Sequence, residues 1–157
     1  MKVTNRDINY LQTIFFLGGN KNPINPTNLG NKLNVTKVTA YQKMKRLAIF
    51  GFGTYIRQKG FLLNRKSIIE IERTIYQHHV LEKFFTQTLG ISCDQACQET
   101  SQINGSLSED FINKIHKKLG EPSKCNCGCK ISPPYTQANL QGCNWCVSSF
   151  SNNNTKS

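Results

Sequence analysis

The stretch from residue 27 to residue 63 most restricts what this chain can fold into, because its pattern predicts two short helices followed by a hairpin. Thr27 can cap the first helix, whose apolar residues Leu29 and Leu33 lie about one turn apart. Asn34 then breaks this helix. Two short helices joined by a tight turn are typical of the helix-turn-helix motif, whose second helix enters the DNA major groove.

The second helix of the pair is expected to begin after Thr36, which can cap it, and to end near Gly51. It is rich in polar and basic residues, as a helix that meets DNA must be. Its predicted inward positions are Val38, Tyr41, Met44 and Leu47.

Two short β-type runs flank Gln58-Lys59-Gly60, and this arrangement predicts a hairpin. A hairpin directly after a helix-turn-helix is a wing, with Arg57 and Lys59 near its tip. Before the pair, apolar spacing predicts a further helix over 5–18, ended by Gly18-Gly19.

Charge is distributed very unevenly along the 157 residues, which carry a net charge of +11. Residues 1–66 hold twelve Lys or Arg side chains and one acid, Asp7, whereas the other 91 residues hold eight basic and eight acidic side chains. A basic head on a neutral remainder indicates a polyanion such as double-stranded DNA as partner. The alternative is a basic surface that only keeps the chain soluble.

Behind the hairpin, the pattern predicts three helices that would form a dimerisation unit. The first runs from Asn64 to Leu89, the second from Ser92 to about Ile103, and the third from a Ser108 cap. Asn104-Gly105 is expected to be a turn, and the third helix carries Phe111, Ile112, Ile115 and Leu119 before Gly120 and Pro122 end it. The first helix has a stripe suited to burial against another helix, namely Ile71, Ile75, His78, Glu82, Phe85 and Leu89.

We therefore predict a mostly α chain in three parts. Residues 1–64 form a winged helix-turn-helix domain, and residues 65–122 form an all-helical dimerisation and effector domain. Residues 123–157 form a Cys-rich tail whose Ser- and Asn-rich end is expected to be disordered. The chain shows no apolar run of membrane-spanning length and no signal peptide, so we expect an intracellular, cytoplasmic protein.

Two sets of residues are candidates for metal binding. His78 and Glu82 lie on one helical face within an apolar stripe, so both need a partner, which a metal ion or a His–Glu hydrogen bond could supply. Further along the chain, Cys93 and Cys97 lie one helical turn apart, and their thiolates suit zinc or another late transition metal.

The second set is a C-x-C-x-C run followed by C-x-x-C. Four of these five thiolates could build a tetrahedral zinc site, and the same residues could hold an iron–sulfur cluster. Free, redox-active thiols are the remaining alternative. The five residues are Cys125, Cys127, Cys129, Cys143 and Cys146.

DNA contact is predicted for the second helix of the pair, the cap of the first, and the wing, where side chains can reach base edges or phosphates. The candidate residues are Thr27, Thr36, Lys37, Thr39, Tyr41, Gln42, Lys45, Arg46, Arg57 and Lys59. Enzymatic function is not predicted, because the sequence shows no Ser/His/Asp set, nucleotide-binding glycine loop or paired catalytic carboxylates.

Over residues 3–132 the chain resembles the DtxR/MntR family of metal-dependent repressors, in particular archaeal members without an SH3-like C-terminal domain. The most specific match is the run from Tyr76 to Phe85, followed by Leu89-Gly90-Ile91. Further matching runs are Val35 to Thr39, Met44 to Leu47, Gly51-Phe52, Tyr55 to Asn64, Leu107-Ser108-Glu109 and Cys125 to Gly128.

The resemblance implies a homodimer that binds palindromic operator DNA when a divalent metal is present. Of the family's two metal sites, one would fall at Asn9, Gln12, Ser101, Asn104 and Gly105, which lack the ligand types that a transition metal needs. That site is expected to be lost. The other would fall at His78, Glu82 and Cys97, the last being a softer ligand than the family's histidine.

These observations together predict a homodimeric transcriptional regulator whose activity depends on a Cys-bound metal, an iron–sulfur cluster or a redox state. Three alternatives stay open. One is a constitutive winged-helix DNA-binding protein with only a structural zinc. Another is a winged-helix module that docks on another protein. The third is an electron-transfer or redox protein, which would need an iron–sulfur cluster.

Overall fold

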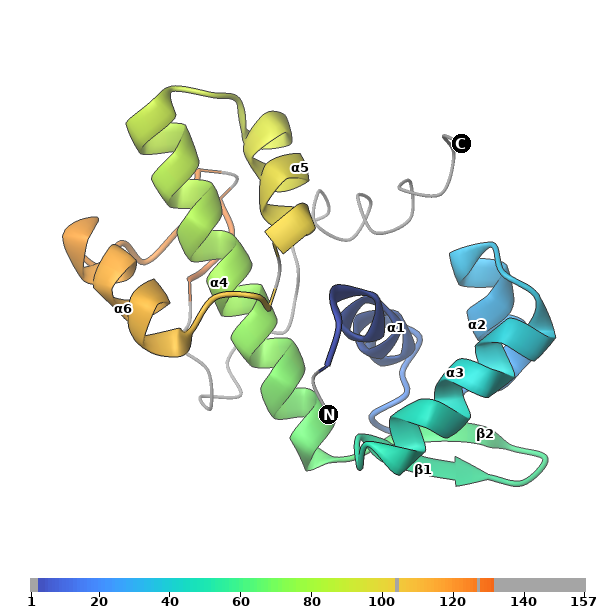
Figure 1. Ribbon diagram of the computed structural model, residues 1–157. Helices are drawn as coiled ribbons and strands as arrows, with labels where there is room; N and C mark the ends of the chain where they lie inside the picture. Colours follow the sequence, from blue (N-terminus) through green and yellow to red (C-terminus); the bar gives the residue numbers. More distant parts are fainter. Residues whose placement is uncertain (1–2, 104, 127, 132–157) are drawn as a thin grey trace. The chain divides into compact units, whose positions relative to one another are not determined.

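A computed structural model describes residues 3–103, 105–126 and 128–131 (Figure 1). The described part is mostly helical and contains one two-stranded antiparallel sheet. The elements are α1 (Asn5–Phe16), α2 (Pro26–Leu33), α3 (Lys37–Ile49), β1 (Gly53–Ile56), β2 (Gly60–Leu63), α4 (Arg65–Leu89), α5 (Cys93–Ile103) and α6 (Glu109–Lys118). This order confirms the prediction of a mostly α chain in which a winged helix-turn-helix precedes a helical part.

The chain divides into two compact units, and α4 begins in the first and continues into the second. In the described residues the first unit spans 3–71 and the second spans 72–131. We refer to them as the winged unit and the helical unit.

Helix α1 begins with a capping box. The Thr4 hydroxyl accepts a hydrogen bond from the backbone N–H of Asp7, and the Asp7 carboxylate accepts one from the backbone N–H of Thr4. Such reciprocal bonds satisfy two donors that a helix start otherwise leaves unpaired. The helix buries Leu11 and Ile14 completely, and it ends before Gly18, whose φ of 90° favours glycine.

Helix α2 begins two residues earlier than predicted, and its cap is Asn25 and not Thr27. The Asn25 side chain accepts a hydrogen bond from the backbone N–H of Asn28 at 2.8 Å. Pro26 follows as the first helical residue, where its missing N–H costs nothing. Asn34 ends the helix in the left-handed conformation, as its sequence position predicted.

Helix α3 begins after its Thr36 cap, as predicted, but two of its four expected inward residues point outward. Ala40, Met44 and Leu47 are fully buried, whereas Val38 is 63% exposed and Tyr41 is 42% exposed. The buried three recur at intervals of four and three residues and so form one stripe. Each residue advances about 100° around the helix, so Val38 and Tyr41 fall outside this stripe.

The predicted hairpin is present, with Gly53 paired to Leu63 and Ile56 paired to Gly60. Its turn differs from the expected one, because Gly60 belongs to β2 and Gln58 takes the positive φ of 63°. Phe61 also exchanges backbone hydrogen bonds with Ile24, which ties the hairpin to the segment before α2. Gly60 sits against the Ile24 carbonyl so closely that a Cβ atom would collide with it.

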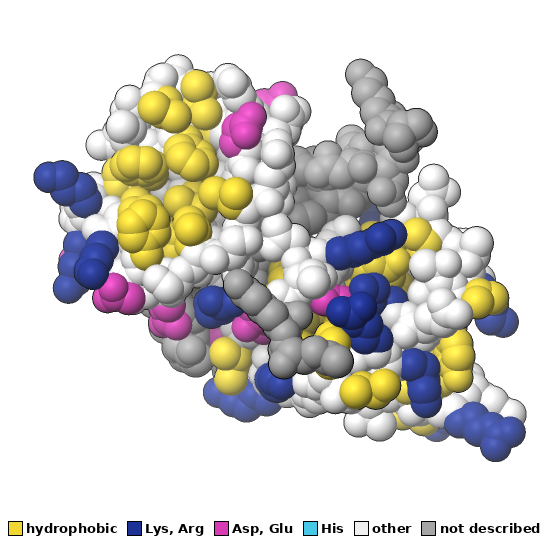
Figure 2. Space-filling model, in the orientation of Figure 1, with side chains coloured by type: hydrophobic (Ala, Val, Ile, Leu, Met, Phe, Trp, Pro, Cys, Tyr) yellow, Lys and Arg dark blue, Asp and Glu magenta, His cyan; other side chains and the backbone are white. Residues whose placement is uncertain are grey.

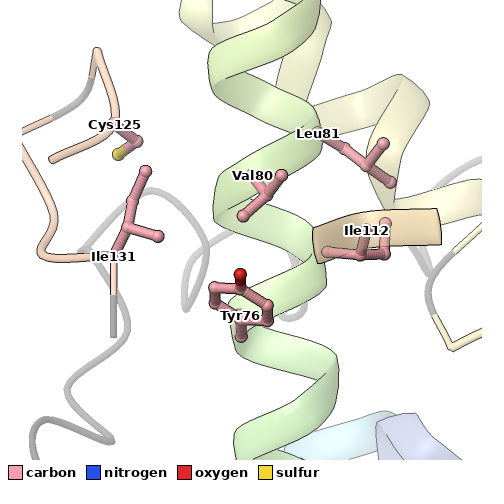
Figure 3. Packing of buried hydrophobic residues seen from close by; sticks show 6 residues of the cluster. All are labelled: Tyr76, Val80, Leu81, Ile112, Cys125 and Ile131. Atoms are coloured by element: carbon pink, nitrogen blue, oxygen red, sulfur yellow. The ribbon is translucent and has the colours of Figure 1, made fainter. Parts of the chain in front are cut away.

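The helical unit consists of α4 from Glu72 onward, α5, α6 and the loop 123–131. Ser108 caps α6, as predicted, by accepting a hydrogen bond from the backbone N–H of Phe111. One apolar cluster joins α4 and α6 to the loop (Figure 3), and its buried members are Tyr76, Val80, Leu81, Ile112, Cys125 and Ile131. The start of the Cys-rich segment thus belongs to the packed interior of this unit.

None of the helices in the described residues is both long enough and apolar enough to cross a lipid bilayer.

Candidate DNA-binding face and metal centres

The residues predicted to contact DNA lie on α2, α3 and the hairpin. Thr39 is half-buried and its hydroxyl lies 2.9 Å from that of Thr36, whereas the other nine candidates are exposed. Figure 2 shows Lys and Arg side chains spread over the winged unit. The exposed polar side of α3 is therefore available to a ligand.

A groove of about 560 Å³ lies where the start of α2, the start of α3 and the hairpin meet. Within it the rings of Tyr41 and Tyr55 make an edge contact at 5.1 Å between centroids, and Lys45 Nζ lies 5.8 Å from the Tyr55 ring. These contacts link α3 to β1. The groove is lined by Asn25, Pro26, Thr27, Lys37, Val38, Tyr41, Tyr55, Gln58, Lys59 and Gly60.

Asp7, the one acid among residues 1–66, is fully buried. Lys43 Nζ lies 2.8 Å from its carboxylate, and Arg46 lies 3.9 Å from the other oxygen. Burial pushes the pKa of Asp7 up, but hydrogen bonds from Lys43 and Thr4 outweigh burial and hold the pKa below its ordinary value. Among residues 3–66, the outer surface of the winged unit therefore carries Lys and Arg side chains and no Asp or Glu side chain.

A first group of candidate metal ligands joins α4 to α5. One ligand atom each from His78, Glu82 and Cys97 lies within 4.8 Å of the other two, and all three residues are buried. Cys97 Sγ lies 3.4 Å from His78 Nε2. Nitrogen, oxygen and sulfur donors that converge out of contact with water suit a late transition metal.

A second group joins α4 to the loop 123–131 and contains His79, Cys125 and Cys129, whose ligand atoms also lie within 4.8 Å of one another. Sequence reasoning assigned both cysteines to a metal site but missed His79. Adjacent helical residues point about 100° apart, and His78 and His79 accordingly belong to different groups. A pair of consecutive histidines in a helix was the available signal for a second site.

The electrostatics of the second group favour a cation beside a thiolate. Burial disfavours the charged form of His79, but Cys125 and Glu82 outweigh it and raise the pKa of His79 to about 9. Burial raises the pKa of the Cys125 thiol, yet His79 outweighs this and leaves that pKa below its ordinary value. Glu82 Oε2 lies 3.5 Å from His79 Nδ1, so the two groups adjoin at this carboxylate.

Of the other residues considered for metal binding, Cys93 was a predicted ligand, whereas Asn9, Gln12, Ser101, Asn104 and Gly105 mark the family site that is expected to be lost. Cys93 is half-buried at the start of α5 and belongs to neither group. Asn9 and Gln12 lie on α1, and their side-chain oxygens are buried without a hydrogen-bond partner among the described residues. Ser101 donates to the Cys97 carbonyl, and Gly105 has a φ of 72°. Outside the described residues lie Asn104, Cys127, Cys143 and Cys146.

The helical unit also exposes apolar side chains. Leu89 is 63% exposed and Phe111 is 50% exposed, and Phe85 and Ile115 are only partly buried. Figure 2 shows apolar side chains gathered on the visible face of this unit. A contiguous apolar surface of this kind is typical of an interaction site.

Comparisons with known proteins agree with this description. Residues 66–133 match a family described as iron dependent repressor, metal binding and dimerisation domain. The HTH-type transcriptional regulator MJ0568 of Methanocaldococcus jannaschii is 26% identical over 107 residues, which make up 68% of this chain and 86% of the relative.

Solved structures share the fold. The protein SSo2273 from Sulfolobus solfataricus superposes with a TM-score of 0.75 at 22% identity, over 83% of this chain and all of that one. The manganese regulator SloR superposes with a TM-score of 0.66 at 23% identity, over 85% of this chain and 61% of SloR. IdeR of T. acidophilum superposes with a TM-score of 0.62 at 20% identity, over 90% of this chain and 64% of IdeR.

A winged helix-turn-helix followed by a metal-binding and dimerisation domain defines a class of transcriptional regulators and not of enzymes. Over residues 66–133 the chain thus matches the metal-binding and dimerisation domain of iron-dependent repressors, and this match together with the archaeal relative supports the resemblance to DtxR/MntR-type regulators seen in the sequence.

Proposed function

We propose that the chain is a homodimeric regulator that binds operator DNA through α3 and the hairpin, with a metal bound to the helical unit as its effector. The observation that carries this proposal is the exposed, acid-free face of the winged unit, where Lys37 and Lys59 line a groove beside the start of α3. Groove-lining side chains would meet base edges, while Lys45, Arg46 and Arg57 would hold phosphates.

The exposed apolar residues of the helical unit support a homodimer. Leu89 and Phe111 each expose half or more of their surface, which costs free energy unless a partner covers them. A second copy of this chain is the partner that the matched dimerisation domain favours. Two copies would present two recognition helices to the two halves of a palindromic site.

The proposed effector site consists of His78, Glu82 and Cys97. These buried donors of three chemical types fit a divalent transition metal, with zinc favoured by the thiolate. A bound ion would supply a link between α4 and α5. Because α4 continues from the winged unit into the helical unit, a change in this region would shift the spacing of the recognition helices in a dimer.

A direct test measures DNA affinity by fluorescence anisotropy with zinc and with a chelator. The DNA is a duplex selected from a random pool, with a scrambled duplex for comparison, and light scattering gives the oligomeric state. We expect a dimer that binds the selected duplex at least tenfold more tightly with zinc. His78→Gln and Cys97→Ser should abolish that difference, whereas the matched control Cys93→Ser should keep it.

Each other outcome favours one of the alternatives. Equal affinity with and without metal would indicate a constitutive DNA-binding protein with a structural ion. Weak binding that is lost at moderate salt and is equal for both duplexes would indicate a protein-interaction module. A brown protein that contains iron and sulfide would indicate that the C-terminal cysteines hold a cluster, in place of the single ion proposed.

A further inference from the structure

The loop after α6 folds back on itself and brings two cysteines together. The backbone N–H of Cys125 donates to the carbonyl of Cys129 at 2.9 Å, and that of Ile131 donates to Ser123 at 2.9 Å. Gly128, with a φ of 84°, lies in the turn between them, and its N–H donates to the Cys125 carbonyl. The chain's own hydrogen bonds therefore set the spacing of Cys125 and Cys129.

Side-chain contacts hold this loop against α4. Asn126 accepts a hydrogen bond from Lys83 at 2.6 Å and donates one to the Thr86 hydroxyl at 2.6 Å. Cys125 and Ile131 are buried in the apolar cluster with Tyr76 and Val80 (Figure 3). The loop is thus fixed to the helix on which His79 lies.

His79 completes the arrangement from the helix side. It is 2% exposed, and its Nδ1 atom lies 3.5 Å from Glu82 Oε2 without a hydrogen bond of good geometry among the described residues. A buried imidazole nitrogen in that position has lost water and gained only a long contact with a carboxylate in exchange. A metal ion bound to His79 and both sulfur atoms would satisfy the site.

We propose that His79, Cys125 and Cys129 form a second metal site, for a thiophilic divalent ion such as zinc, distinct from the site at His78, Glu82 and Cys97. Two sulfur donors and one nitrogen donor favour zinc over manganese or iron(II), which prefer harder ligands. The rings of His78 and His79 stand at 86° to each other with centroids 5.8 Å apart, so each ring serves one group.

This site would fasten the loop 123–131 to α4, and its existence does not depend on DNA binding. Because Glu82 adjoins both groups, a substitution there would disturb both and cannot separate them. His79 and Cys129 each belong to the second group alone, and Cys97 belongs to the first group alone. These residues therefore allow the two sites to be tested independently.

The test uses the full chain with Cys127→Ser, Cys143→Ser and Cys146→Ser, prepared without metal and under reducing conditions. These changes leave the four cysteines that the structure describes. Cobalt(II) is the probe, because thiolate-to-cobalt charge-transfer absorption reports sulfur ligands directly, and zinc displaces it afterwards. The proposal predicts two bound equivalents. The second should be lost or weakened roughly 100-fold or more in Cys129→Ser and in His79→Gln, beyond the effect of a supporting residue.

Matched controls make the result decisive. Cys93→Ser should leave both equivalents and the spectrum unchanged, and Cys97→Ser should remove the other equivalent while keeping the charge-transfer bands of the second site. Circular dichroism of each metal-free variant checks that it folds. The proposal fails if the Cys127, Cys143 and Cys146 changes abolish the thiolate spectrum, or if Cys129→Ser and His79→Gln both bind cobalt like their parent. Either failure leaves the operator-binding assay unaffected, so the two proposals can fall separately.

Discussion

The winged unit and the helical unit bury different chemistry. The winged unit has an interior made mainly of apolar side chains such as Leu11, Leu29 and Met44, and its one buried acid is paired with Lys43. The helical unit buries two adjacent histidines, Glu82 and two cysteines in two convergent groups. Burial of ionisable groups is costly unless they are paired or bind a metal. The contrast indicates that the winged unit is stable by packing, whereas the helical unit combines its apolar cluster with buried ionisable groups that need partners.

The largest expected effect tests whether the winged unit depends on packing alone. Leu11→Ala should lower the free energy of unfolding by about 3 kcal/mol, because the fully buried leucine leaves a cavity. Urea denaturation followed by circular dichroism, with zinc and with a chelator, should give the same loss in both conditions. Ile49→Ala, at an 80% exposed position of the same unit, should change stability by less than about 0.5 kcal/mol. If Leu11→Ala lowered the free energy of unfolding only in the presence of zinc, the winged unit would not be stable by packing alone.

A somewhat smaller effect tests whether only the winged unit meets DNA. Each phosphate contact contributes a salt slope of about 0.9, so Lys45→Ala with Arg46→Ala should weaken binding about 60-fold at ~0.1 M salt. The slope of log affinity against log salt should fall by about 2. Lys117→Ala with Lys118→Ala removes the same charge from exposed positions on α6 and should have little effect. Equal losses in the two double variants would mean that DNA contacts both units.

The smallest effect concerns the buried Asp7–Lys43 pair. Lys43→Met should cost about 1 to 3 kcal/mol at neutral pH, because the Asp7 carboxylate loses its ammonium partner. The pKa of folded Asp7 lies below its ordinary value of 3.8, so this stabilisation is present above that pH. It should be lost as the pH falls through the folded pKa, and urea denaturation over a pH series should show the wild type and variant converging.

Lys114 provides the matched control in the helical unit. It pairs with Asp110 at 2.8 Å, but both side chains are more than two-thirds exposed. Lys114→Met should therefore leave the free energy of unfolding almost unchanged at any pH. A pH-independent loss in Lys43→Met, or an equal loss in Lys114→Met, would show that burial does not distinguish the two pairs.

Local sequence signals predicted most of the fold. Thr36 and Ser108 were recognised as caps, and the apolar spacing identified the helices of both units. Errors arose where two residues compete for one role. Asn25 takes the cap expected of Thr27, because Pro26 is suited to the first helical turn. Val38 was assigned inward because it is apolar, but the small Ala40 is the residue that packs.

The candidate sites were harder to predict because they depend on long-range contacts. Spacing within one helix was enough to pair His78 with Glu82, and family resemblance added Cys97. Nothing in the local sequence shows that a loop more than 40 residues later returns to α4 and brings Cys125 and Cys129 to His79. That convergence arises from the packing of Ile131 and Cys125 against the helix.

The placement of His78 and His79 side by side on α4 has a mechanical consequence. Both rings are attached to one stiff rod, about 100° apart around its axis. A rotation of α4 about its axis that moves the His78 ring relative to α5 also rotates the His79 ring by the same angle relative to the loop. The contacts of α4 with the loop and with α5 therefore cannot be adjusted independently. A rotation of α4 imposed at one group of ligands changes the geometry at the other group.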